Sequence, residues 1–341
     1  MRITSLNKFV TSAFVLCSLA SLQVQAQAQQ QVQPQEDKWP TRAISITGGF
    51  PNGAGTDIYA RKLGEGLTAL WNVPVVVDSK TGAGGNIASD AVARAAPDGY
   101  SYLFGTAGTH AINVALYKKL NFDVEKDFTK IALLGDVPNV LLVNSKKHPE
   151  IKTCADLLKI AREKPGALNY ASTGNGASGH LAGAQFANAA NINVVHVPYR
   201  GQGPAMAALL AGDVEFFFNQ SAAAINAIKG GQATAIAVTT RSRLSALPDV
   251  PTVEQGCALP GFESSTWYGL FGPANIPPAI TKKMSDAVIG IISKPEFKQW
   301  LMETQGITPA ADSSVQAFEK IHQADIKRWA EIVKMSGAQV D

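Results

Sequence analysis

The sequence predicts an α/β fold of mostly parallel sheets flanked by helices, and three observations support this prediction. Short apolar strands alternate with amphipathic helices, and several strands end in glycine-rich loops that lead into a helix. The 341 residues, 46% hydrophobic and 17% charged, suffice for about two domains of roughly 150 residues each. This alternation implies right-handed crossovers between parallel strands, so ligands are expected beyond the carboxyl ends of the strands.

The N-terminus has the features of a secretory signal. Arg2 and Lys8 form a basic segment ahead of the apolar stretch 9–22, which is too short and too often interrupted by serine for a membrane anchor. Small residues offer cleavage near Ala26 or Ala28. We therefore predict that the mature protein is exported.

The predicted signal peptide is 1–28, and the glutamine-rich segment 29–38 is predicted to be a flexible leader. Removing the signal takes away two basic residues and leaves 28 basic against 27 acidic, a net charge of +1. No basic cluster accompanies this balance, which argues against a nucleic-acid surface.

Of the three cysteines, Cys17 leaves with the signal peptide, so the mature chain keeps Cys154 and Cys257. In an exported protein two cysteines can form one disulfide, but they can equally be two separately buried thiols. The sequence leaves both alternatives open.

The first strand–loop–helix unit contains the strongest ligand signal. Residues 44–47 alternate as a strand does, five glycine or proline positions within 48–55 form a loop, and helical spacing follows over 57–70. Free N–H groups at the start of such a helix favour an anion. Thr56 or Asp57 could cap these donors instead.

Two further units of this kind follow. The apolar run 73–78 is typical of a buried parallel strand, and the glycine loop 82–86 leads into a helix that Pro97 stops. The third strand, 100–105, ends in the polar segment 106–110. These loops are expected to converge at one edge of the sheet.

A second unit begins near 140–144 and repeats the same logic. Its strands end in loops that contain glycine or polar residues, most clearly at 173–180 and 198–203. Its predicted helices are 154–164, an alanine-rich helix through Ala190 and 205–211, and its predicted strands are 168–172, 193–197, 214–218 and 233–239.

The last region consists of packing elements without assigned chemistry. The aromatic run 265–272 is typical of a strand, and Pro277–Pro278 opens a helix. The final helix is predicted to start at Ser313, with Gln316 in the capping-box position, and to end at Gly337.

Two catalytic or cofactor motifs are weak. Residues 174–179 fit the dinucleotide fingerprint, but the next strand ends in Tyr199–Arg200 without the acidic residue that a ribose requires. Ser178 lies in a segment similar to a nucleophile elbow, except that His180 stands where the second glycine belongs. An exported serine hydrolase that uses Ser178 with His180 or His110 is therefore the alternative function, and the histidines lack metal-ligand spacing.

Several polar residues at strand ends have two interpretations each. His110 and His180 could contact a ligand or brace their loops, and Arg200 could bind a carboxylate or hold its loop through a salt bridge. Asp57 is a helix cap or a partner for the polar end of a ligand. Asn219 closes a very apolar strand, where its amide suits a neutral or anionic group.

Four segments together resemble one family: Gly49–Asp57, Lys80–Ile87, Tyr170–His180 and Val197–Gly201. In order and spacing they are similar to the Bug-type solute-binding proteins of tripartite tricarboxylate transporters. The resemblance spans the chain from Trp39 to the last helix, and the set is far more specific than any single motif.

This resemblance implies a periplasmic, two-lobed, Venus-flytrap protein that closes on a small carboxylate and delivers it to a membrane permease. Lobe 1 would be 39–139 with 265–341, and lobe 2 would be 140–264, with hinge crossings near Val140 and Ser265. We expect a monomer with no cofactor, no metal and no catalytic residue. The ligand would be a di- or tricarboxylate, an aromatic acid or an amino acid, particularly an acidic one.

The resemblance also places the ligand-binding residues. The loop matching Phe50 to Asp57 and the loop matching Ser172 to Ser178 would grip one carboxylate from opposite lobes. The full expected set is Phe50, Asn52, Gly55, Thr56, Asp57, Thr106, Ala107, Thr109, His110, Ser172, Thr173, Gly174, Gly176, Ser178, His180, Tyr199, Arg200, Gly201 and Asn219.

Three positions depart from the common family pattern. Asn52 replaces a frequent proline or glycine, and Thr81 replaces a frequent proline. Asn219 stands where an aspartate is common. The last change removes a possible negative charge and suggests a more anionic or less amine-like ligand.

Overall fold

Strand–loop–helix units build most of the molecule. The computed structural model describes residues 38–340, so the predicted signal peptide and nearly all of the leader lie outside the described residues. The described residues from Arg42 onward form one compact unit, which contains every strand named below.

The first sheet has a parallel core. Strand β1 (Ile44–Gly48) lies between β2 (Val75–Ser79) and β3 (Ser101–Thr106) and is parallel to both. Strand β9 (Ser265–Pro273) returns antiparallel beside β3. Because β1, β2 and β3 run in the same direction, the loops that follow them leave the sheet at the same edge.

The second sheet repeats this arrangement. Strand β5 (Asn169–Ser172) lies between β6 (Val195–Pro198) and β7 (Phe216–Gln220) and is parallel to both. Strand β8 (Thr234–Val238) pairs antiparallel with β4 (Phe128–Val143), which also pairs antiparallel with β7.

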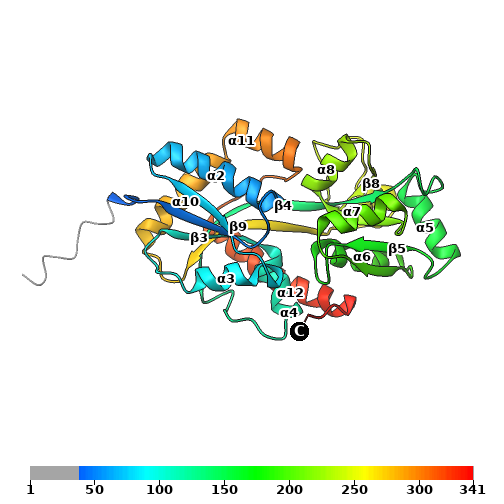
Figure 1. Ribbon diagram of the computed structural model, residues 1–341, viewed down its shortest axis with the longest axis horizontal. Coiled ribbons are helices and arrows are strands. Elements are labelled where there is room, and N and C mark those ends of the chain that lie inside the picture. Colours follow the sequence, from blue (N-terminus) through cyan, green and yellow to red (C-terminus); the bar gives the residue numbers. More distant parts are fainter. Residues whose placement is uncertain (1–37, 341) are drawn as a thin grey trace, which may run out of the picture. The chain divides into compact units, whose positions relative to one another are not determined.

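Two strands, β4 and β9, connect the sheets and form the predicted hinge of crossing strands (Figure 1). From Phe128 to Pro138, β4 pairs with β9 in the first sheet; from Asn139 to Val143 it pairs with β7 in the second. The sequence indicated only the last part of β4, because Lys130, Gly135 and Asp136 obscure its alternation. The protein is thus two-lobed, with each lobe built on one sheet.

Helices flank both sheets (Figure 1). The longer ones are α2 (Gly55–Trp71), α5 (Cys154–Glu163), α6 (Ser178–Ala190), α7 (Gln202–Ala211), α8 (Ser221–Lys229), α10 (Pro278–Ile292) and α12 (Val315–Ser336). The shorter ones are η2 (Ala83–Gly85), α3 (Asn86–Ala93), η3 (Gly108–Ile112), α4 (Asn113–Leu116), α9 (Val253–Cys257), α11 (Pro295–Trp300) and η4 (Leu301–Gln305).

The core of the second lobe lies on both faces of its sheet. Phe216 and Phe218 pack with Phe186 of α6 on one face, whereas Phe217 packs with Ile225 of α8 on the other. Successive strand residues point to opposite faces, so three consecutive phenylalanines bury β7 from both sides.

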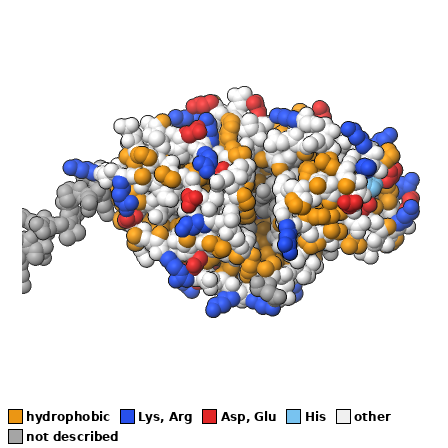
Figure 2. All heavy atoms as spheres, viewed as in Figure 1, with side chains coloured by type: hydrophobic (Ala, Val, Ile, Leu, Met, Phe, Trp, Pro, Cys, Tyr) orange, Lys and Arg blue, Asp and Glu red, His pale blue; other side chains and the backbone are white. Residues whose placement is uncertain are grey.

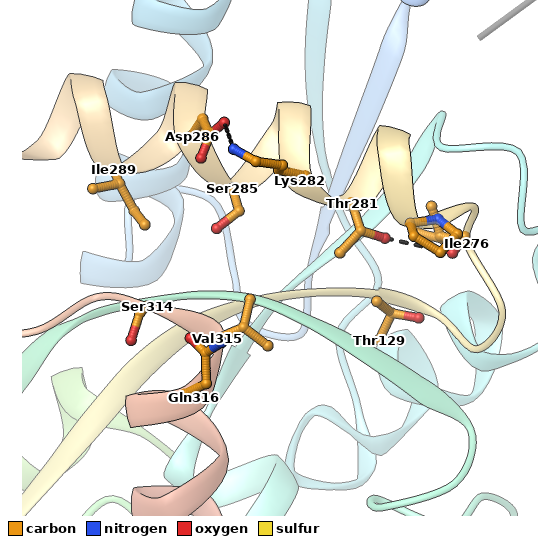
Figure 3. A pocket seen from close by; sticks show the side chains of 11 residues that line it. Thr129, Ile276, Thr281, Lys282, Ser285, Asp286, Ile289, Ser314, Val315 and Gln316 are labelled. Carbon is orange, nitrogen blue, oxygen red and sulfur yellow. Dashed lines mark hydrogen bonds and ion pairs between the residues drawn. The ribbon is translucent and has the colours of Figure 1, made fainter.

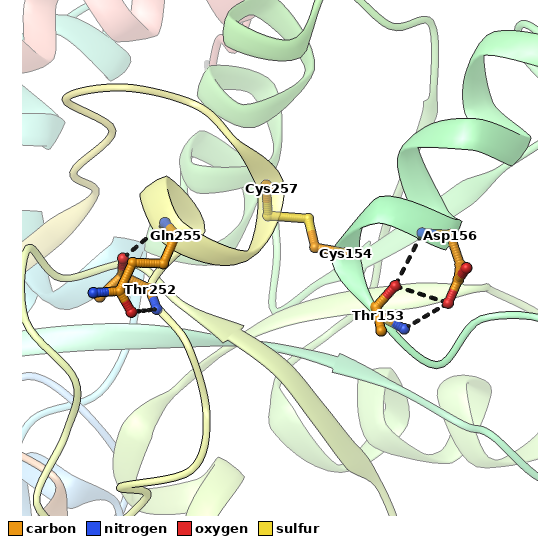
Figure 4. Close-up of a disulfide and its surroundings, with 6 residues drawn as sticks. All are labelled: Thr153, Cys154, Asp156, Thr252, Gln255 and Cys257. Atoms are coloured by element: carbon orange, nitrogen blue, oxygen red, sulfur yellow. Dashed lines mark hydrogen bonds between the residues drawn. A yellow bond between two sulfur atoms is a disulfide. The ribbon is translucent and has the colours of Figure 1, made fainter.

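A disulfide, Cys154–Cys257, joins α5 to α9 within the second lobe (Figure 4). Both helices begin with a capping box, in which Thr153 and Thr252 accept from the third backbone N–H of their helices. The structure therefore selects the disulfide from the two alternatives that the sequence left open.

Three helix starts differ from the sequence-based expectation, and that of α7 lies at Gln202 rather than at 205. The N-cap of α12 is Ser314, whose Oγ accepts from the N–H of Ala317, so the expected capping box at Ser313 was wrong by one residue. Helix α2 begins at Gly55 behind the N-cap Ala54, two residues before the expected start.

Candidate ligand-binding site

The strand-end loops of the first lobe converge. A Cβ at Gly49 would lie 2.7 Å from the Cα of Gly85, and a Cβ at Gly85 would lie 2.6 Å from Cγ2 of Thr109 and 3.6 Å from the Phe50 ring. The loops after β1, β2 and β3 therefore form one wall, as the parallel strands predict, and only glycine fits at these two close approaches.

At this wall, α2 begins without a side-chain cap. Its N-cap is Ala54, and no side chain accepts from its first turn. The Asp57 carboxylate instead accepts from the N–H of Gly53 at 2.8 Å and pairs with Arg61 at 2.9 Å. Burial raises the pKa of Asp57, but the hydrogen bonds from Arg61 and Gly53 outweigh it and leave that pKa lowered. Asp57 thus braces the loop as a carboxylate.

The second lobe supplies a facing loop from β5. The hydroxyl of Ser172 donates to the carbonyl of Gly174 and accepts from its N–H, which folds the loop back on itself. The segment after β6 joins this loop, because Tyr199 N–H donates to Ser172 O at 3.0 Å and Gly201 N–H donates to Thr173 O at 3.3 Å.

Helix α6 also starts without a side-chain cap, behind the N-cap Ala177. Its start is pressed against the end of β7, since a Cβ at Gly179 would lie 2.1 Å from the carbonyl oxygen of Phe218. The hydroxyl of Ser178 donates to Oδ1 of Asn139 at 3.3 Å. Helix α8, which follows β7 directly, likewise lacks a side-chain cap.

Two stacked imidazoles support the second-lobe loop. His180 and His196 lie 3.7 Å apart with an interplanar angle of 6°. Nδ1 of His180 accepts from the N–H of Gly176 at 3.0 Å, and Nε2 of His196 lies 2.6 Å from the Ser172 hydroxyl. Burial lowers the pKa of His180 to about 4 and, with the neighbouring His180, that of His196 to about 3. Both rings are therefore neutral braces at pH 7.

His110 lies in an aromatic core. Its ring stacks on Phe271 at 4.1 Å and meets Phe128 edge-on at 4.7 Å, and its side chain is fully buried. Burial lowers its pKa well below the usual value. Nδ1 of His110 lies 2.8 Å from the Thr109 hydroxyl, and Nε2 of His322 lies 2.8 Å from the His110 carbonyl oxygen. Its surroundings are those of a structural residue.

The lobes approach each other at two places. A Cβ at Gly55 would lie 3.8 Å from Cβ of Ala222 in the first turn of α8 and 3.8 Å from Oε1 of Gln305. A Cβ at Gly176 would lie 2.0 Å from Cδ2 of Leu116 in α4. Figure 2 shows the surface hollowed between the two lobes. The starts of α2 and α8 therefore meet across the interlobe space, and the start of α6 lies against the end of β7.

Four buried polar side chains near these helix starts keep unpaired atoms. Among the described residues, no hydrogen-bond partner exists for Thr56 Oγ1, Asn139 Nδ2, Asn219 Oδ1 and Nδ2, or Gln305 Oε1. Each of these residues is at most 6% exposed. Buried polar atoms are normally paired, so these four side chains have hydrogen-bonding capacity left for a ligand or for water.

The expected site residues divide into two groups by burial. The buried ones are Thr56, Asp57, Thr106, Ala107, Thr109, His110, Ser172, Gly176, His180 and Asn219. The partly or fully exposed ones are Phe50, Asn52, Gly55, Thr173, Gly174, Ser178, Tyr199, Arg200 and Gly201.

Sequence reasoning missed three polar residues beside these loops. Asn139 precedes the apolar run that marked the second lobe, Ser221 opens the unexpected helix α8, and Gln305 lies in η4. Only Asn139 carried a signal, as a polar residue at the start of a buried strand. Gln305 reaches the site through tertiary structure alone.

Two surface cavities lie apart from these loops. One of about 570 Å³ lies between α10 and the start of α12, where Ser285 points toward Val315, and Lys282 is already paired with Asp286 (Figure 3). The other, of about 400 Å³, borders the disulfide. Neither cavity is lined by an expected site residue.

Within residues 38–340, no group of three or more histidine, cysteine, aspartate or glutamate side chains is arranged to hold a metal ion. A search of the same residues for a helix with the length and hydropathy needed to cross a bilayer finds none.

Comparison with known proteins agrees with this architecture. A protein from the tcbD–tcbE intergenic region of Pseudomonas sp. strain P51 is 33% identical over 87% of this chain and 87% of its own length. The Rhodopseudomonas palustris protein Rpa4515, solved with adipate, matches with a TM-score of 0.81 and 30% identity over 89% of this chain and 100% of its own. MatC of the same organism, solved with malate, matches with a TM-score of 0.75 and 30% identity over 86% of this chain and 100% of its own.

The two-lobed fold, the hinge of crossing strands and the facing loops define a periplasmic solute-binding protein. The profile described as tripartite tricarboxylate transporter family receptor matches residues 59–338. The chain belongs to this receptor family, as its four sequence motifs predicted.

Proposed function

We propose that this protein is a periplasmic receptor that captures a small carboxylate between its lobes and delivers it to a tripartite tricarboxylate-type membrane transporter. The observation that carries the proposal is the set of three uncapped helix starts, α2, α6 and α8, beside the facing loops. Each start leaves backbone N–H groups without intrahelical acceptors and has a partial positive charge, which suits a carboxylate.

The described helices differ in their caps: α3, α7, α10 and α11 lack a side-chain cap, as α2, α6 and α8 do. Helices α5, α9 and α12 have threonine or serine caps, whereas α2 and α6 have alanine at the N-cap, which cannot cap by its side chain. We propose that the ligand carboxylate satisfies these donors, with Thr56 and the exposed Arg200 near it. Closure of the lobes then excludes water and strengthens these hydrogen bonds.

The candidate ligands are di- and tricarboxylates, aromatic acids and acidic amino acids. The adipate and malate of the two R. palustris structures belong to the first of these classes. We further propose a monomer without cofactor, exported by a signal peptide cleaved near Ala26 or Ala28. Its lobes would be 39–139 with 265–341, and 140–264.

We propose that the protein is not an enzyme. Ser178 donates to Asn139, and Nδ1 of His180 already accepts from the N–H of Gly176. The pKa of His180, about 4, makes it a weak base at pH 7. These contacts favour loop support over serine activation.

Thermal unfolding of the mature protein against a panel of carboxylates and their amides tests this function. An acid at about 100 times its dissociation constant should stabilise the fold by about 2.7 kcal/mol, and the same compound with every carboxylate converted to an amide should not. Stabilisation by amides and acids alike would contradict the carboxylate site. Hydrolysis of p-nitrophenyl esters that Ser178→Ala abolishes would establish the hydrolase alternative instead.

A further inference from the structure

Two buried amide side chains, Asn219 and Gln305, lack the partners that buried amides require. Asn219 is 1% exposed, and neither its Oδ1 nor its Nδ2 has a hydrogen-bond partner among the described residues. Gln305 is 6% exposed, and its Oε1 is unpaired within the same part of the chain. Burial of an unpaired polar group costs about 1–3 kcal/mol, so each amide calls for a partner from outside the chain.

Both residues lie beside the start of α8. Asn219 occupies the end of β7 on the same face as Phe217, which packs against α8. Two residues further on, the Ser221 hydroxyl donates to the Gln305 carbonyl at 2.8 Å. The Gln305 side chain thus comes from the first lobe, and Asn219 comes from the second.

The uncapped start of α2 adjoins the same place. The position of a Cβ at Gly55 lies 3.8 Å from Gln305 Oε1 and 3.5 Å from the hydroxyl of Tyr268 on the hinge strand β9. If the carboxylate of a ligand lies at the start of α2, the rest of the ligand can therefore reach Gln305 and Asn219.

The unpaired atoms specify the chemistry of the ligand group. Asn219 presents a donor and an acceptor, and Gln305 presents an acceptor. A carboxylate only accepts and would leave both amide oxygens unpaired, whereas an ammonium only donates and would leave Asn219 Nδ2 unpaired. A hydroxyl or a primary amide does both. The orientation of the Gln305 amide follows from its Nε2, which donates to Thr304 Oγ1 at 3.5 Å and leaves Oε1 as the unpaired acceptor.

We propose that Asn219 and Gln305 are specificity residues that bind a neutral hydroxyl or amide group on the part of the ligand remote from its carboxylate. This inference rests on the proposed function and narrows its ligand class. The ligand is then a carboxylic acid that also carries a hydroxyl or carboxamide group.

Three series of acids test the inference, each with one carboxylate and one variable remote group. The four-carbon series is butyrate, 4-hydroxybutyrate, succinamate, succinate and 4-aminobutyrate, and a six-carbon series carries the same five remote groups. A para-substituted benzoate series carries them too, with an aminomethyl group as its ammonium member because an aromatic amine is neutral at pH 7. Dissociation constants come from calorimetry at pH 7. We expect the hydroxyl or amide member of the best series to bind about 10- to 100-fold more tightly than its methyl, carboxylate and ammonium members.

Isosteric variants test the two residues. Asn219→Asp and Gln305→Glu each replace an amide by a carboxylate, so each should move the preference toward the ammonium member by about tenfold or more. Asn188→Asp, on the exposed surface of α6, adds the same charge and should change nothing. Circular dichroism and thermal unfolding confirm that each variant is folded.

The outcomes separate this inference from the proposed function. Suppose that acids bind tightly but that the carboxylate or ammonium member binds best, or that affinity does not depend on the remote group. Either result overturns the inference and leaves the proposed carboxylate receptor intact. Unchanged preferences in folded Asn219→Asp and Gln305→Glu also overturn it. Binding by no member of any series contradicts both proposals.

Discussion

The Ser172 loop depends on two histidines that must stay neutral. Protonation of His180 would turn Nδ1 from an acceptor into a donor and abolish its hydrogen bond from Gly176. The stacked His196 ring, 2.6 Å from the Ser172 hydroxyl, would become a second positive charge against the first. Acid should therefore loosen this loop before the rest of the lobe.

This pair predicts a pH dependence of stability. The folded-state pKa values, about 4 and about 3, lie below the ordinary value of 6.5, so the unfolded chain binds protons first as the pH falls. Their effect on the free energy of unfolding is thus absent above about pH 7.5, and the destabilisation grows as the pH falls from about 6.5 to about 3. Urea unfolding of the wild type and His196→Gln across this range checks the prediction, since the variant should lose less stability.

The comparison between variant and wild type is needed because Asp136 titrates in the same range. Desolvation, with Glu263 and Asp325 nearby, raises its pKa to about 6. A raised carboxyl pKa destabilises the fold as the pH rises through 3.8 to 6, the opposite slope. Identical pH profiles for wild type and His196→Gln would contradict the assigned role of His196.

At the scale of elements, α12 is fixed to the hinge by one carboxylate. Asp325 accepts from the indole N–H groups of Trp267 on β9 and Trp329 on α12, and it pairs with Arg328, which also donates to the Ser265 carbonyl. The side chain of Asp325 is 11% exposed. This cluster attaches the last helix to the strand that crosses between the lobes.

Removal of this carboxylate should be strongly destabilising. We expect Asp325→Ala to lower the free energy of unfolding by about 3 kcal/mol, because it removes the anion that pairs with Arg328 and leaves two indole donors unpaired. The matched control is Asp286→Ala, which removes an exposed partner of Lys282 and should cost less than about 1 kcal/mol. Urea denaturation measures both, and equal losses would show that the cluster does not anchor α12.

The disulfide stabilises the second lobe in a different way. Cys154 and Cys257 close a loop with a sequence separation of 103 residues. In the double variant Cys154→Ala/Cys257→Ala, the free energy of unfolding should fall by about 3–5 kcal/mol, because the unfolded chain is no longer constrained by the bond. The ligand affinity of the folded protein should be unchanged. The wild type under reducing conditions serves as the control and should lose a similar amount. A loss below about 1 kcal/mol would refute this estimate.

The elements also show what sequence can predict. The strand–loop–helix units after β1, β2, β3 and β5 were visible because glycine loops and a change of period mark them. Helix α8 was not visible, because its continuous apolar context hides the helical period. The first half of β4 was not visible either, because its alternation is interrupted. The family motifs placed the facing loops, but Gln305 reaches them only through the packing of η4 against α8.

At the scale of the whole molecule, Gly176 and Leu116 interlock the lobes. Gly176 has φ 72° in the second lobe, and a Cβ there would overlap Leu116, which is 3% exposed in the core of the first. We expect Gly176→Ala to keep the lobes apart and weaken binding of the best acid about tenfold or more. Calorimetry measures this change.

Two controls separate interlock from backbone strain. Gly231→Ala places alanine at φ 64° with no atom within 4 Å of its Cβ, so it tests strain alone and should leave binding unchanged. Gly176→Ala/Leu116→Ala removes the overlap and should recover part of the affinity. Wild-type binding by a folded Gly176→Ala variant would contradict the interlock.

Amide chemical shifts of the isotope-labelled mature protein, recorded as the best acid is added, test the central claim most directly. We predict that the N–H signals of Gly55, Thr56, Ser178 and Gly179 shift together and saturate at one ligand per chain, because one carboxylate binds helix starts from both lobes. The corresponding carboxamide should not produce these shifts. Shifts confined to one lobe, or centred on the cavity around Ser285, would contradict the account.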